Sequence, residues 1–286
     1  MDFVQIGDRQ APAIVGIMGL GLPGDFWPPE MIHQLVKLGF QVVLPHNRDA
    51  TFKMRSSWPE IRQSEVLNSI IQVLIGRKVH RAPYTLEDMA LDVVTLLDEI
   101  HLQRVHLMGF SMGGMIAQAI AAHHPNRVVS LTSISSATGR VKTGFGKLTA
   151  IWGLIHEPKG QVSLEAYFHH SLEMLSGKKY QPTDEEIKFG FNKLPQPFDR
   201  QAVYRQLLAI LASGDRSTSV AQIQAPTLVI HGTDDPLLPY IAGLETANLI
   251  AHSTFWGIDG LGHQLPFALA SEMAHRIGMH CHACGD

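Results

Sequence analysis

One serine in this chain stands in a sequence context that suits nucleophilic catalysis. Ser111 is the central residue of Gly109-Phe110-Ser111-Met112-Gly113, which separates a short apolar run from a helical pattern. Between a strand and a helix, this G-x-S-x-G pattern raises the serine hydroxyl above the carboxyl edge of a sheet, beside the free amides of the helix start. A serine hydroxyl attacks efficiently only when an imidazole accepts its proton, so the pattern predicts a partner histidine elsewhere in the chain. The alternative is that Ser111 only caps the helix that follows it.

The elements that would position Ser111 follow an alternation of strands and helices. Short apolar runs, typical of strands buried on both faces, cover Ala13–Met18, Gln41–Leu44, Arg104–Met108, Val128–Ile134, Thr227–His231 and Ser253–Ile258. Between them lie helical patterns, one starting after Thr85 with capping-box residues and one covering Met112–His124. This alternation predicts right-handed strand–helix–strand units, and hence an α/β fold with an open, mostly parallel sheet and flanking helices.

Two segments interrupt the alternation. Residues 52–82 contain one helical pattern, and residues 139–219 contain no clear strand. The second segment holds a concentration of aromatic residues, including Phe145, Trp152, Tyr167, Phe168, Phe198 and Tyr204. We interpret it as a helical lid inserted into an α/β core that comprises residues 1–138 and 220–286. The alternative is an ordinary helical subdomain whose aromatic residues form their own small core.

With these elements in place, the chain resembles the α/β-hydrolase fold family, in which the nucleophile, the acid and the histidine follow one another in that order. The resemblance implies that the acid is Asp235 in Gly232-Thr233-Asp234-Asp235, with Asp234 as the alternative. It implies that His263 is the base, in the loop Gly260-Leu261-Gly262-His263. The carboxylate would hold the imidazole in the correct tautomer and stabilise the imidazolium.

The resemblance also implies where the negative charge of a tetrahedral intermediate would be bound. The donors would be two backbone amides, that of Leu20 after Met18-Gly19 and that of Met112 directly after the nucleophile. Relatives commonly carry a histidine where this chain has Met18. Because the donors are backbone groups, this difference does not remove them.

A glycine loop offers a rival interpretation. Gly19-Leu20-Gly21-Leu22-Pro23-Gly24 has the G-x-G-x-x-G spacing of dinucleotide-binding loops, which would indicate an NAD(P) oxidoreductase. However, Pro23, Pro28 and Pro29 delay the start of any helix, and the Gln41–Leu44 strand has no acidic residue at its tip for a ribose. We therefore expect no cofactor.

Further motifs are similar to an esterase branch that includes aclacinomycin methylesterase, namely Met18-Gly19-Leu20-Gly21, Asn47-Arg48-Asp49 and Ser111-Met112-Gly113-Gly114. The resemblance implies a serine hydrolase that cleaves a carboxylic ester through an acyl-enzyme, with a small-molecule substrate that has an apolar part. An acyltransferase, a thioesterase or a C–C bond hydrolase on the same three residues is the first alternative. A non-catalytic ligand receptor of the same fold is the more remote one.

Three peripheral features of the sequence lead to further expectations. Arg48 and Asp49 are interpreted as a structural pair that holds the loop near the serine. Twelve residues precede the first clear strand, so the first strand of the family is expected to be absent. Residues 280–286 are expected to fray; they contain Cys281 and Cys284 with neighbouring histidines, and this lone C-x-x-C lacks a second ligand pair, so no metal is expected.

The composition of the chain excludes some classes of binding partner. The 286 residues have a net charge of −3 and no run of basic residues, so a nucleic-acid partner is not expected. No apolar stretch approaches the length of a membrane span, and the first residues do not have the pattern of a signal peptide. With only two cysteines there is no disulfide framework, and a cytoplasmic location is expected. The sequence indicates no oligomeric state.

Overall fold

The computed structural model describes residues 1–51, 60–156 and 163–285. A seven-stranded sheet lies at its centre, in the spatial order β1-β3-β2-β4-β5-β6-β7. All neighbouring strands are parallel except β1 and β3, which are antiparallel. The strands are β1 (Phe3–Ile6), β2 (Ala13–Ile17), β3 (Gln41–Pro45), β4 (Val105–Phe110), β5 (Val128–Ile134), β6 (Thr227–Gly232) and β7 (Ser253–Ile258). The six apolar runs of the sequence are therefore strands, with bounds that differ by at most two residues.

Strand β1 was not predicted. Phe3–Ile6 pairs with β3, with Phe3 opposite Pro45 and Ile6 opposite Val42, so treating the first twelve residues as strandless was wrong. The strand has four residues, none of them fully buried. So short a segment at a sheet edge has no apolar run or clear alternation that could distinguish it from a loop.

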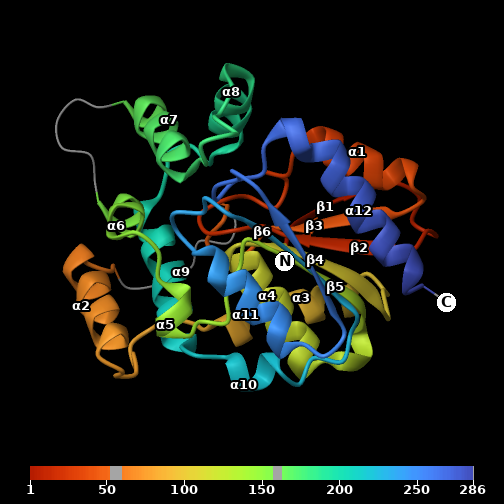
Figure 1. Cartoon of the computed structure of the whole chain (residues 1–286), viewed down its shortest axis with the longest axis horizontal. Coiled ribbons are helices and arrows are strands. Elements are labelled where there is room, and N and C mark those ends of the chain that lie inside the picture. Colours follow the sequence, from red (N-terminus) through yellow and green to blue (C-terminus); the bar gives the residue numbers. More distant parts are fainter. Residues whose placement is uncertain (52–59, 157–162, 286) are drawn as a thin grey trace.

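Helices cover both faces of the sheet (Figure 1). On one face α1 (Pro29–Lys37) packs against α12 (Ala270–Ala283), and on the other lie α3 (Leu86–Glu99), α4 (Met112–His123) and α11 (Tyr240–Leu249). Helix α3 begins at the predicted capping box, in which the Asp88 amide donates to Thr85 Oγ1 over 3.2 Å. Short 3₁₀ helices follow α4 and precede α12, at Pro125–Arg127 (η2) and Phe267–Leu269 (η3).

Between β5 and β6 the chain forms only helices among the residues that are described there. They are α5 (Val141–Gly144), α6 (Leu148–Ile155), α7 (Leu164–Leu175), α8 (Asp184–Lys193), α9 (Arg200–Ser213) and α10 (Ser217–Val220). Helix α2 (Gln63–Leu74), from the other interruption, packs against α9. The first part of that interruption, residues 52–59, lies outside the described residues. Helices α6 to α8 extend away from the sheet at one end of the molecule (Figure 1).

The C-terminal segment is ordered further than predicted. Helix α12 continues to Ala283, so the expectation of a frayed end from residue 280 was wrong for most of that segment. Cys281 follows Met273, Ala274 and Ile277 on one apolar face, and it is 2% exposed. Burial raises the pKa of the Cys281 thiol to about 12. The Cys281 side chain therefore packs between α12 and the sheet. This packing holds the end of the helix in place.

No helix in the described parts of the chain combines the length and the apolar character that a membrane crossing requires.

Candidate active site

Ser111 occupies a sharp turn between β4 and α4. Its φ angle is 56°, in the left-handed region that a non-glycine residue rarely adopts. Both nearby glycines are required by close contacts: a Cβ on Gly109 would lie 2.3 Å from the Gly113 carbonyl oxygen, and one on Gly113 would lie 2.0 Å from that of Ile17. Ser136 Oγ donates to the Ser111 carbonyl over 2.8 Å. The turn thus holds the serine in a strained conformation through backbone contacts on both sides.

The three side chains predicted from separate loops lie in one hydrogen-bonded series. Ser111 Oγ is 2.8 Å from His263 Nε2, and His263 Nδ1 is 2.7 Å from Asp235 Oδ2. All three residues are buried, and the Phe110 ring packs against the imidazole at 5.2 Å between centroids. Asp234 is only half-buried, and its carboxylate accepts a hydrogen bond from a backbone amide of the α7–α8 connection at 3.3 Å. Of the two adjacent aspartates, Asp235 is therefore the one that contacts the histidine.

The Asp235 carboxylate is oriented on both of its oxygens. Oδ1 accepts hydrogen bonds from the amides of Leu237, at 2.9 Å, and Leu238, at 2.8 Å, which leaves Oδ2 to face His263. Burial alone would raise the pKa of Asp235, but the charge of the facing His263 and the hydrogen bonds from the His231 and His263 side chains outweigh it and lower that pKa to about 2. His231, which the sequence analysis did not single out, lies with Nε2 3.5 Å from Oδ2. The site therefore holds an ionised carboxylate at His263 Nδ1, and the imidazole can present Nε2 as an acceptor to Ser111.

The two predicted backbone donors flank Ser111. Met112 is the first residue of α4, and Leu20 follows Gly19, on which a Cβ would lie 3.2 Å from Ser111 Cβ. Within the described part of the chain neither the Leu20 nor the Met112 amide donates to a protein acceptor. A helix start offers such free N–H groups together with the positive end of its dipole. Met112 lies at such a helix start, and neither amide has a protein acceptor among the described residues that would compete with an oxygen bound next to Ser111.

The glycine loop after β2 does not have the geometry of a dinucleotide site. Helix α1 begins only at Pro29, so the loop does not run directly into a helix start. Gly24 has another reason to be glycine, because a Cβ there would lie 2.2 Å from the Pro45 carbonyl oxygen at the end of β3. Among the described residues no group of three His, Cys, Asp or Glu side chains is arranged to hold a metal ion.

Arg48 and Asp49 do not pair with each other, so their interpretation as a pair was wrong. Arg48 pairs with Asp92 on α3, with Nη2 2.9 Å from Oδ1. Asp49 forms two hydrogen bonds of 2.8 Å with Arg205 on α9. The two residues lie in a turn in which the Ala50 amide donates to the Asn47 carbonyl over 2.9 Å, and Asp49 has a φ of 65°. Each side chain therefore finds a partner on a different helix.

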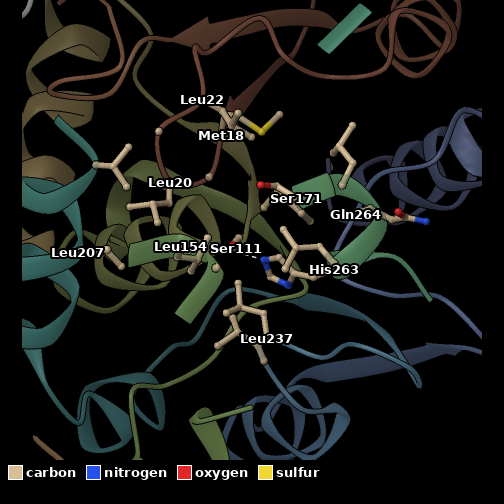
Figure 2. Close-up of a pocket in the computed structure, with 18 of the residues that line it drawn as sticks. Met18, Leu20, Leu22, Ser111, Leu154, Ser171, Leu207, Leu237, His263 and Gln264 are labelled. Atoms are coloured by element: carbon tan, nitrogen blue, oxygen red, sulfur yellow. Dashed lines mark hydrogen bonds between the residues drawn. The ribbon is translucent and has the colours of Figure 1, made fainter. Parts of the chain in front are cut away.

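A cavity of about 350 Å³ opens in front of the serine. Figure 2 shows Ser111 and His263 facing it, together with Leu20 from the loop after β2, Leu154 from α6 and Leu207 from α9. The wall is mostly apolar and rich in aromatic rings, which are Phe26, Phe110, Phe145, Tyr167, Phe168, Phe189, Phe198 and Phe267. Five of these rings come from the segment between β5 and β6. An apolar cavity with a few polar groups at one place is the usual form of a small-molecule site.

Known proteins of similar sequence and structure share the fold of this chain. Residues 12–267 match the alpha/beta hydrolase fold family. Rhodomycin D methylesterase of Streptomyces peucetius is 25% identical over 97% of this chain and 93% of its own length. The 2-hydroxy-6-oxo-2,4-heptadienoate hydrolase of Pseudomonas putida is 25% identical over 80% of this chain and 84% of its own length. Among solved structures, a meta-cleavage product hydrolase from Pseudomonas fluorescens superposes with a TM-score of 0.74 at 18% identity, covering 99% of this chain and 94% of that protein.

Proposed function

Since the chain belongs to the alpha/beta hydrolase fold family and is a hydrolase of that fold, we propose that it cleaves a carboxylic ester through an acyl-enzyme on Ser111. One observation supports this proposal more strongly than any other. The hydrogen-bonded series from Asp235 through His263 ends at Ser111 Oγ, and this oxygen faces a mostly apolar cavity. Nucleophile, base and orienting acid are thus within hydrogen-bond reach of one another before any substrate is bound.

In the first half of the reaction, Ser111 Oγ forms a bond to the ester carbonyl carbon while its proton moves to His263 Nε2. The carbonyl oxygen becomes an oxyanion and accepts hydrogen bonds from the Leu20 and Met112 amides; one such donor is typically worth about 10²–10³-fold in kcat. Asp235 stabilises the imidazolium. When the carbonyl re-forms, the bond to the alkoxide breaks, and the alcohol leaves with the proton from His263.

In the second half, water takes the place of the alcohol. His263 accepts a proton from the water as it attacks the acyl carbon, and the same two amides bind the second oxyanion. The proton then returns to Ser111 Oγ as its bond to the acyl group breaks, which releases the carboxylic acid. Apart from the substrate and water, this sequence of steps uses only groups of the chain.

The cavity supports a substrate with an apolar part. We propose that residues 139–219 act as a lid, because five of the aromatic rings around the cavity belong to them. The similarity to rhodomycin D methylesterase also supports an ester as the substrate. A substrate that buries apolar surface against these rings would gain roughly 25 cal/mol per Å² of area removed from water.

Cleavage of a carbon–carbon bond by the same three residues is the second candidate, and the similarity to 2-hydroxy-6-oxo-2,4-heptadienoate hydrolase favours it over acyl transfer or thioester hydrolysis. Product analysis separates the classes. Ester hydrolysis gives one acid and one alcohol, whereas a transferase passes the acyl group to an added alcohol in preference to water. A ligand receptor without catalysis would turn over no activated ester at all.

The first test is labelling with a fluorophosphonate, followed by the mass of the intact protein. We expect one adduct on the wild type and none on Ser111→Ala or His263→Ala, with parallel loss of p-nitrophenyl ester hydrolysis. Thermal unfolding of all three proteins serves as the control for folding. A folded wild type that takes up no adduct and hydrolyses no activated ester would overturn the proposal.

A further inference from the structure

A buried glutamine from α9 holds the loop that carries the Leu20 amide. Gln206 is fully buried, and its Oε1 accepts a hydrogen bond of 2.7 Å from the Gly21 amide. Its Nε2 donates a hydrogen bond of 2.6 Å to the Arg48 carbonyl in the loop after β3. The side-chain amide thus joins two loops of the sheet to a helix that lies more than 150 residues further along the chain. Both bonds are partly buried, and the Gln206 side chain itself is fully buried, so losing either bond leaves a polar atom of that side chain without a partner.

The bond to Gly21 selects the conformation of a tight turn. The Leu22 amide donates to the Gly19 carbonyl at 3.4 Å, and Gly21, the third residue of this four-residue turn, has a φ of 72°. A positive φ at that place is the mark of a type II turn, and the type I form has the central peptide flipped. Because Gly21 N–H belongs to the central Leu20–Gly21 peptide, its bond to Gln206 holds this peptide in the type II orientation.

The turn lies directly against the nucleophile. Gly19 lies so close to Ser111 that a Cβ built on it would be 3.2 Å from Ser111 Cβ. In a trans peptide the carbonyl and the N–H point in opposite directions. The Gly19 carbonyl points into the turn toward Leu22, so the Leu20 N–H of the same peptide points out of it. The direction of the Leu20 amide is therefore set by the Gly19–Leu22 turn as a whole, and the Gln206 bond to the Gly21 amide holds that turn in its place beside Ser111.

Two other side chains of α9 anchor the helix near Gln206, one at this turn and one at the loop after β3. A Cβ on Gly21 would lie 3.2 Å from Val203 Cγ2, so the helix packs closely against the turn. Arg205, next to Gln206, forms the buried ion pair with Asp49, and the two side chains are 6% and 1% exposed. The helix is thus anchored where Gln206 makes its two bonds.

We propose that Gln206 is a positioning residue for ester hydrolysis, because it holds the Gly19–Leu22 turn so that the Leu20 amide can bind the oxyanion. The helical segment between β5 and β6 then completes the oxyanion site in addition to lining the cavity. This inference rests on the proposed function.

The test compares two glutamines of the same helix. Gln201 makes a similar bridge, with Oε1 accepting from the Ile61 amide at 2.6 Å and Nε2 donating to the Ile61 carbonyl at 3.0 Å. Ile61 lies next to α2, away from the Gly19–Leu22 turn, so Gln201→Met removes an equivalent pair of bonds without touching that turn. Gln206→Met and Gln201→Met are measured with a p-nitrophenyl ester and with a trifluoromethyl ketone, which adds to the serine and places a negative oxygen in the oxyanion site.

For Gln206→Met we expect kcat to fall by about 10²-fold, the effect of a displaced donor, with KM within about twofold. Affinity for the trifluoromethyl ketone should fall by the same factor as kcat/KM. Gln201→Met should retain kcat within about threefold. Equal effects of the two variants, or a change in KM alone, would overturn the inference while the proposed function stands.

A second variant keeps the test decisive if Gln206→Met does not fold. Gln206→Glu has the same size, and its protonated carboxyl group can accept from the Gly21 amide and donate to the Arg48 carbonyl. Its kcat relative to the wild type at the same pH should therefore rise as the pH falls. A ratio that stays low down to the lowest pH at which the variant is folded would contradict the positioning role. A wild type that is inactive toward all esters would instead overturn the proposed function.

Discussion

Replacing Asp235 by asparagine tests the proposed mechanism at the residue whose side-chain orientation is fixed by the most hydrogen bonds. The two backbone amides that donate to Oδ1, those of Leu237 and Leu238, need an acceptor, so the asparagine must keep its oxygen at that position. Its NH₂ group then takes the place of Oδ2, which is 2.7 Å from His263 Nδ1. Since the NH₂ group donates, Nδ1 must accept, and the ring proton moves to Nε2. An Nε2 that carries a proton cannot accept the proton of Ser111.

The size of the effect follows from this exchange of tautomers. In a serine triad of known mechanism the equivalent exchange lowers kcat by about 10⁴-fold, or about 5.5 kcal/mol of transition-state stabilisation. The volume of the side chain is unchanged and both Oδ1 bonds remain, so we expect the fold to be retained. We therefore expect Asp235→Asn to lower kcat by about 10⁴-fold without a matching change in KM.

The assay is steady-state hydrolysis of a p-nitrophenyl ester, with thermal unfolding as the control for folding. The adjacent Asp234 supplies a matched control, because its half-buried carboxylate accepts a 3.3 Å hydrogen bond from the Lys178 amide and does not contact His263. Asp234→Asn should retain kcat within about threefold. If Asp235→Asn stays active, or if both variants lose activity equally, the assignment of the acid to Asp235 is wrong.

Three further outcomes are expected. Arg205→Met should lower the free energy of unfolding by about 3–5 kcal/mol in urea titrations, because it leaves the buried Asp49 carboxylate without its cation, and adding Asp49→Asn should restore part of this loss. Gly113→Ala should give little folded protein by circular dichroism, since its Cβ would lie 2.0 Å from the Ile17 carbonyl oxygen; a normal unfolding transition would refute this. The pKa of Asp235 is about 2 in the folded protein against an ordinary value of 3.8, so its ionisation adds about 2 kcal/mol of stability above pH 4 that disappears as the pH falls toward 2. Urea titrations from pH 5 downward should show this loss in the wild type but not in Asp235→Asn, and equal pH dependence of the two proteins would contradict it.

Much of the fold could be predicted from the sequence because its signals are local. Buried strands appear as continuous apolar runs. The start of the helix after Thr85 is marked in the sequence by a capping box, which the structure contains. The turn at Ser111 could be found in the same way, since close backbone contacts on either side require the glycines at 109 and 113. Strand β1 was not predicted because three half-buried residues and one exposed residue at a sheet edge do not form a recognisable period.

The contacts of the candidate active site could not be predicted from local signals, because they join residues that are far apart in the sequence. Ser111 and His263 are 152 positions apart, and Gln206 and Gly21 are 185 apart. No local period or spacing encodes such a pair, and only a resemblance to a family could connect the first of them. For the second the sequence offers no signal, since a glutamine on a helix is most often a solvated side chain.

The sequence by itself therefore determined the order of strands and helices, the α/β class and the turn that presents Ser111, because backbone sterics and periodic burial act over a few residues. The tertiary structure alone decided which of the adjacent aspartates contacts His263 and which partners Arg48 and Asp49 take. It also decided that α9 supports the Gly19–Leu22 turn through Gln206. Each of these outcomes depends on the direction in which a side chain points once distant segments have packed, and packing is a property of the whole chain.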